Sequence, residues 1–89
     1  MLSLPSKPWK KVRISELAEK TFQLTFVSEL ENEAQFHEII EEDIAASLGP
    51  QDRIGVADWP SRSVVITTAD LPTLKRNLVY ASIMVEAHE

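Results

Sequence analysis

The order in which apolar residues change their spacing constrains the fold of this chain more than any other feature. In residues 20–27 apolar and polar side chains alternate, as in a strand that buries one face. Residues 29–48 instead repeat apolar side chains every three or four positions, which indicates a helix. Alternation returns in residues 53–59 and 63–68, and a second helical pattern closes the chain. The predicted order is therefore strand, helix, strand, strand, helix.

Turn and cap residues separate these segments. Gly49 and Pro50 provide a helix stop, in which the glycine is available for a left-handed cap. Residues 60–62, Pro-Ser-Arg, form a short polar turn that favours an antiparallel hairpin. Asp70 is placed to cap the last helix, and Pro72 is tolerated in its first turn. We therefore expect an α+β fold in which a three-stranded antiparallel sheet carries two helices on one face.

The chain has 89 residues, enough for one small domain. Two of its five prolines, Pro5 and Pro8, lie in residues 1–19, which we expect to be an extended N-terminal arm with a helical turn over residues 15–19. Residues 20–89 are expected to form a single interaction domain.

Composition excludes several classes of site and of protein. Cysteine is absent, so the chain has no disulfide and no thiolate metal site. The N-terminus lacks the pattern of a signal peptide, and the longest apolar stretch, residues 78–85, is too short to span a bilayer, which takes about 20 residues. We expect a soluble cytoplasmic protein.

The closing helix, starting at Asp70, has more apolar residues than one packed face requires. One stripe, which should pack on the sheet, consists of Leu71, Leu74, Leu78, Ala81 and Val85. A second apolar surface opposite it consists of Val79, Tyr80, Ile83, Met84 and Ala87. This second surface packs either on the first helix and the arm or on another subunit. Both interpretations can hold, one for each half of the helix.

The pattern of these segments resembles that of a known family, the small dimerisation subunits of KEOPS, the complex that makes threonylcarbamoyl adenosine in tRNA. The matching pieces are Phe22-Gln23-Leu24-Thr25-Phe26, Ser28-Glu29-Leu30-Glu31-Asn32-Glu33-Ala34, Ser63-Val64-Val65-Ile66 and Ala69-Asp70-Leu71-Pro72-Thr73-Leu74-Lys75. The resemblance covers about residues 20–89. Lys75 stands where the family usually has arginine, and Val79 where asparagine is common. The chain is thus similar to a diverged member or a paralogue of this family.

The resemblance implies a non-catalytic scaffold subunit, not an enzyme, with no catalytic residue, cofactor or metal. Its implied partners are a second copy or a related small subunit, together with the catalytic transferase subunit of the complex, while contact with tRNA is indirect. The expected partner interface comprises Leu74, Leu78, Val79, Tyr80, Ala81, Ile83, Met84 and Val85.

An alternative function is RNA binding by the arm. The net charge of the chain is −5, yet its first thirteen residues contain four basic and no acidic side chains. The residues that would contact RNA by charge and stacking are Lys7, Trp9, Lys10, Lys11 and Arg13. The competing interpretation is a solvated tail with Trp9 held in an apolar groove.

His37 and Trp59 each suggest a further possible role. His37 and Glu41 have the i, i+4 spacing of two metal ligands on one helix. No third strong ligand is evident, so a partly buried, hydrogen-bonded His37 is the preferred interpretation. Trp59 is either the end of the core face of its strand or an exposed anchor for a partner.

Overall fold

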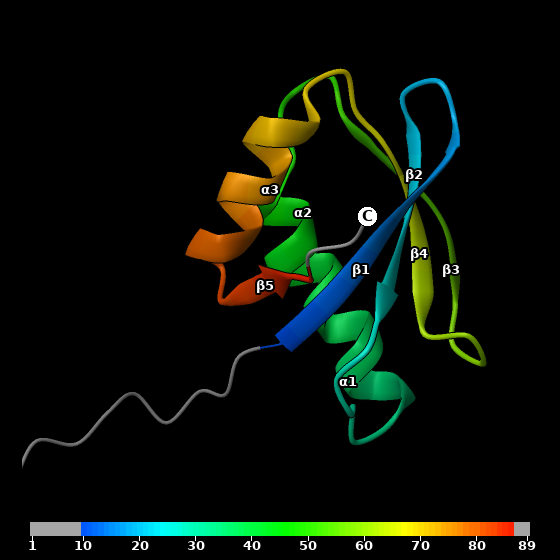
Figure 1. Ribbon diagram of the computed structural model, residues 1–89. Coiled ribbons are helices and arrows are strands. Elements are labelled where there is room, and N and C mark those ends of the chain that lie inside the picture. Colours follow the sequence, from blue (N-terminus) through cyan, green and yellow to red (C-terminus); the bar gives the residue numbers. More distant parts are fainter. Residues whose placement is uncertain (1–9, 87–89) are drawn as a thin grey trace, which may run out of the picture.

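The computed structural model describes residues 10–86 of the chain. They form an α+β fold built on a five-stranded mixed sheet with strand order β3-β4-β2-β1-β5 (Figure 1). The expectation of a three-stranded, fully antiparallel sheet is therefore wrong. The two additional strands come from segments that were expected to be the arm and the end of the last helix.

The first additional strand is β1 (Lys10–Ala18), which pairs antiparallel with β2 (Thr21–Phe26). Val12 and Ile14 on β1 are buried and Arg13 between them is exposed, so this part of the predicted arm lies inside the sheet. The helical turn expected over residues 15–19 is replaced by the end of this strand and a tight turn. Lys20 closes that turn with a left-handed backbone, at φ 63°.

The predicted hairpin of the second half of the chain is confirmed. Strand β3 (Arg53–Asp58) pairs antiparallel with β4 (Ser63–Thr67), which in turn pairs antiparallel with β2. The register of the hairpin shifts between Ile54 and Ala57, where the β3 backbone contains a bulge. Since β3 forms one edge of the sheet, the bulge makes this edge a poor template for further pairing.

The first predicted helix consists of three consecutive segments, α1 (Glu33–Glu38), a π-helical turn η1 (Ile39–Ile44) and α2 (Ala45–Ser47). It begins at Asn32, whose side chain accepts a hydrogen bond from the Gln35 amide at 2.9 Å. It ends at Ser47, because Leu48 is already extended. The left-handed cap expected at Gly49 is absent, since the glycine has no positive φ.

The last helix, α3 (Leu71–Tyr80), begins as predicted but ends early. The chain turns at Ala81 and Ser82 and then forms β5 (Ile83–Val85), which pairs in parallel with the start of β1. Ser82 makes this turn with a left-handed backbone, at φ 66°. A helix that continues to residue 85 is therefore excluded.

Both helices cover the same face of the sheet, as predicted (Figure 1). Each contributes to one apolar core with the inward side chains of the strands. The buried apolar residues are Val12, Ile14, Leu24, Phe26, Phe36, Ile39, Ile40, Ile44, Val64, Ile66, Leu74, Leu78 and Ile83. Within residues 10–86, no helix is long and apolar enough to cross a membrane.

Candidate partner-binding surface

The end of α3 presents the most exposed aromatic side chain in residues 10–86. Tyr80 is 78% exposed, and its neighbour Val79 is 44% exposed. Leu74 and Leu78 on the opposite side of the helix are fully buried and fix its orientation on the sheet. Because successive residues of a helix are about 100° apart, burial of this stripe turns Val79 and Tyr80 toward solvent.

The start of α3 is held by a cap. The Asp70 carboxylate accepts hydrogen bonds from the Thr73 hydroxyl at 2.7 Å and from the Thr73 amide at 3.2 Å. These bonds, led by the one from the hydroxyl, lower the pKa of Asp70 below its ordinary value of 3.8. The cap predicted from the sequence is therefore present.

A shallow hollow of about 320 Å³ lies beside Tyr80, between the ends of α2 and α3. Its lining consists of Ala46, Ser47, Asn77, Tyr80 and Ala81. Both alanines are too small to fill the space between the helices, and Ala46 is exposed. The hollow is therefore able to receive a large apolar side chain from another molecule, in the way that helix ridges fill helix grooves.

Reciprocal hydrogen bonds fix the floor of this hollow. The Asn77 side-chain amide donates to the Ser47 carbonyl at 3.1 Å, and the Ser47 hydroxyl lies 3.3 Å from the Asn77 carbonyl. The same hydroxyl bonds the Asp43 carbonyl at 2.8 Å. These contacts join the ends of the two helices and hold the lining residues Ser47 and Asn77 in place.

The residues predicted for the partner interface do not share one environment. Three of them, Leu74, Leu78 and Ile83, are buried in the core and cannot contact a partner while the domain is folded. Ala81 and Val85 are half-buried, whereas Val79, Tyr80 and Met84 are exposed. The burial of Ile83 in β5 explains part of the apolar excess that the sequence places at the end of the chain.

Ala46 and Asn77 belong to this surface but were not predicted from the sequence. The adjacent small residues Ala45 and Ala46 near the end of the first helix were the only available signal. That signal is weak, because small residues are common on solvated helix faces.

The basic residues of the arm lie in different places. Lys10 is 9% exposed at the start of β1, and Lys11 is exposed. Arg13 pairs with Glu86, with 2.8 Å between the guanidinium and the carboxylate. Lys7 and Trp9 lie outside the described residues. Of the basic side chains within β1, Lys11 alone is both exposed and without a carboxylate partner, so the described part of the arm does not favour the RNA hypothesis.

Of the prediction of a partly buried, hydrogen-bonded His37, the hydrogen bond is present but the burial is not. The side chain is 46% exposed, and its Nε2 atom lies 3.4 Å from the Glu33 carboxylate, one turn before it, rather than beside Glu41. Among residues 10–86 no group of three or more His, Cys, Asp or Glu side chains is arranged to hold a metal ion. The His37 ring contacts Phe36, which belongs to the core.

Trp59 is half-buried at the end of β3. Its ring lies 5.5 Å from that of Phe36, and the Arg62 guanidinium stacks over it at 3.8 Å. Of the two interpretations of Trp59, the structure therefore supports the end of the core face.

No family model, curated protein or solved structure matches the chain.

Proposed function

We propose that this chain is a non-catalytic interaction subunit, similar to the small dimerisation subunits of KEOPS-type tRNA-modification complexes. It would bind another subunit through the exposed end of α3. The observation that carries the proposal is Tyr80, a large and 78% exposed aromatic side chain at the rim of a hollow of about 320 Å³. Exposed tyrosines beside unfilled hollows are the kind of feature from which interface hot spots are built.

The expected partner contributes a helix. The hollow is formed by two helix ends and lined by small side chains, so it fits a leucine, methionine or phenylalanine projecting from a third helix. Docking through a helical bundle is also what the family resemblance implies for the catalytic transferase subunit. A second copy of the chain or a related small subunit is the other partner that the resemblance implies.

The first experiment measures association. Light scattering on the 10.0 kDa chain reports whether it forms a dimer, and a pull-down with a KEOPS-type transferase subunit tests the larger complex. Leu78→Glu is unsuitable as a test of binding, because Leu78 is buried and its loss would unfold the domain.

Tyr80→Glu is the informative substitution, and Glu38→Lys is its control at an exposed site on the other helix. A hot-spot tyrosine contributes about 2 kcal/mol or more, so we expect Tyr80→Glu to weaken association roughly thirtyfold or more. The control should change it less than twofold, and both variants should melt near the wild-type temperature. A chain that remains monomeric and also fails to bind the transferase would refute the proposal.

A further inference from the structure

A second concave surface lies on the other flank of α3. It is a groove of about 530 Å³, lined by Ile14, Glu16, Phe22, Leu71, Lys75, Val85 and Glu86. Leu71 and Lys75 lie on the flank opposite Asn77 and Tyr80, as the 100° spacing of helix residues requires. The groove is thus separate from the hollow beside Tyr80, and its role does not depend on the proposed function.

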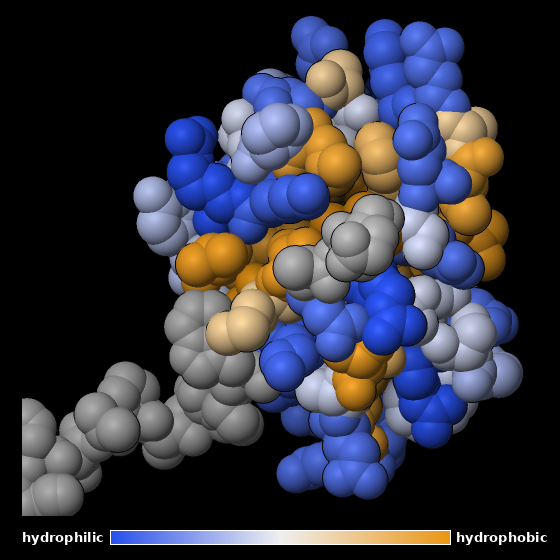
Figure 2. All heavy atoms as spheres, viewed as in Figure 1, coloured by the Kyte–Doolittle hydropathy of each residue, from blue (hydrophilic) through white to orange (hydrophobic). Residues whose placement is uncertain are grey.

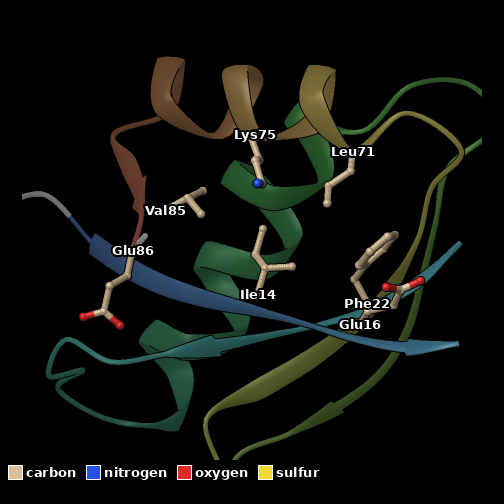
Figure 3. Close-up of a pocket in the computed structure, with 7 residues that line it drawn as sticks. All are labelled: Ile14, Glu16, Phe22, Leu71, Lys75, Val85 and Glu86. Atoms are coloured by element: carbon tan, nitrogen blue, oxygen red, sulfur yellow. The ribbon is translucent and has the colours of Figure 1, made fainter. Parts of the chain in front are cut away.

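The floor and walls of the groove are mainly apolar. Ile14 from β1 and Phe22 from β2 point into it from the sheet, and Leu71 points down from α3 (Figure 3). Val85 closes the end nearest β5 (Figure 3). Apolar surface is visible in the depression between α3 and β1 (Figure 2). An apolar side chain placed here would be removed from water on several sides.

The groove runs along an edge of the sheet that no strand covers within residues 10–86. Strand β5 covers β1 only from Lys10 to Val12, although β1 continues to Ala18. The Lys10 amide donates to Ser82, and the Val12 carbonyl accepts from the Glu86 amide at 2.8 Å. The Lys11 carbonyl, in contrast, accepts from Val27 on the side of β2.

Even-numbered residues of β1 therefore direct their backbone groups toward β5, and odd-numbered residues toward β2. The next even-numbered residues, Ile14 and Glu16, lie beyond the end of β5. Among residues 10–86 no strand lies alongside them on this edge. Unpaired backbone groups at a sheet edge are a template for an added strand.

Two charges line this edge. Glu16 shares the core side of β1 with Ile14 and lies opposite Phe22 in the register. Lys75 extends from α3 toward Ile14 (Figure 3). Neither Glu16 nor Lys75 has an ion-pair partner within residues 10–86. Glu86 is different, because it is already paired with Arg13.

We propose that this groove binds an extended peptide segment of another protein, which adds a strand to the free half of β1. The segment carries one apolar residue and, two positions from it, an arginine or lysine. The apolar side chain enters the space between Ile14 and Leu71, and the basic side chain pairs with Glu16. The spacing of two follows from the alternation of side chains along a strand, since Ile14 and Glu16 are themselves two apart.

Lys75 determines which position takes the cation. Its ammonium group lies over Ile14 (Figure 3), so a basic side chain is disfavoured there and an uncharged apolar one is accepted. Attraction at Glu16 and repulsion at Lys75 therefore define one order of side chains along the added strand.

The test uses the full chain and a fluorescein-labelled peptide, Gly-Thr-Ile-Thr-Arg-Thr-Gly, capped at both ends. Its control has glutamate in place of arginine. Exchanging an attractive partly exposed pair for a repulsive one is expected to weaken binding about fivefold or more in a fluorescence anisotropy titration. In ¹⁵N spectra, the amides of Ile14 and Glu16 should shift and exchange more slowly with solvent on binding.

Replacing Glu16, a residue that lines the groove, should reverse the preference for the arginine peptide over the glutamate peptide. Glu16→Lys is expected to favour the glutamate peptide, while Glu42→Lys, the same charge change on an exposed site of η1, should leave the preference for arginine intact. Glu16 is exposed, so its replacement should not unfold the domain. The proposal is overturned if Glu16→Lys keeps the wild-type preference or if the shifted amides lie elsewhere.

A truncated chain that ends at Glu86 tests whether the groove binds a peptide of another protein or the chain's own C-terminus. If the arginine peptide binds only after residues 87–89 are removed, the groove belongs to the chain's own C-terminus and the proposal fails. Equal binding by both lengths of chain supports a peptide from another protein.

Discussion

The left-handed backbone of Ser82 predicts the sign of the stability change caused by Ser82→Gly. That sign distinguishes a chain that turns at Ser82 from one that continues as a helix. Ser82 follows the last helical turn, at the position where helices that end in this way usually have glycine. A left-handed conformation costs an L-residue about 1–2 kcal/mol, which Ser82→Gly would remove. Glycine also loses more backbone freedom on folding, at a cost of about 0.5–1 kcal/mol.

The substitution should therefore stabilise the protein by a net amount of about 0.5–1 kcal/mol. For a domain of this size, that corresponds to a rise in melting temperature of about 3–6 °C. If residues 71–85 instead formed one continuous helix, the same substitution would destabilise it by about 0.5 kcal/mol, because glycine is a poorer helix former than serine. The turn at Ser82 and the continuous helix therefore predict stability changes of opposite sign for Ser82→Gly.

Thermal unfolding followed by circular dichroism, together with urea titration, measures this difference. Lys20→Gly is the matched positive control, since Lys20 is exposed and also left-handed. Lys75→Gly, inside α3, is the negative control and should cost about 1 kcal/mol. If Lys20→Gly raises the melting temperature while Ser82→Gly lowers it, the chain does not turn at Ser82 and the assignment of β5 is wrong.

Two further substitutions test the core and the cap. Ile83→Ala should cost about 2–4 kcal/mol in urea unfolding because Ile83 is fully buried, whereas Met84→Ala, at a 41% exposed site, should cost about 0.5 kcal/mol; equal costs would contradict the alternation of β5. Asp70→Ala should lower the melting temperature at pH 7. Since the pKa of Asp70 is lower in the folded than in the unfolded protein, its contribution is present above pH 3.8 and is lost as the pH falls below that value. The gap between the two melting temperatures should therefore narrow toward pH 2.5, and a gap independent of pH would show that the carboxylate is not responsible.

Features that depend on neighbouring residues could be predicted from the sequence. The alternation of β2 and of the β3–β4 hairpin, the turn at residues 60–62 and the Asp70 cap all follow from spacings of a few residues. The first helix was also predicted, within four residues at its start and one at its end. Its π-helical middle was not, because no residue type marks the change from an α-helical to a π-helical turn.

The strand β1 was missed because its context suggested an arm. Prolines precede it and basic residues open it, and these features outweighed the alternation of Val12 and Ile14. Strand formation there depends on β2 and β5 on its two sides, and these partners are not visible in a local window.

The strand β5 was missed for another reason. On a helix Ile83 and Val85 fall on the two opposite apolar surfaces, and on a strand they share one face; a run of three residues does not separate the two periods. The residue that ends the helix is a serine rather than a glycine, so the usual stop signal is missing. Burial of Ile83 beside β1 decides the outcome, and burial is a property of the whole fold.

The early end of α3 produces both surfaces for which a partner is proposed. Because the helix stops at Tyr80, this side chain projects from a helix end beside Ala46 instead of continuing along a packed helix. Because β5 spans three residues, it covers the start of β1, and within residues 10–86 no strand lies beside Ile14 and Glu16. A longer β5 would fill the groove, and a longer α3 would remove the parallel strand altogether. The turn at Ser82 therefore fixes the boundaries of the hollow and of the groove. For this reason the sign of the stability change caused by Ser82→Gly bears on both proposals.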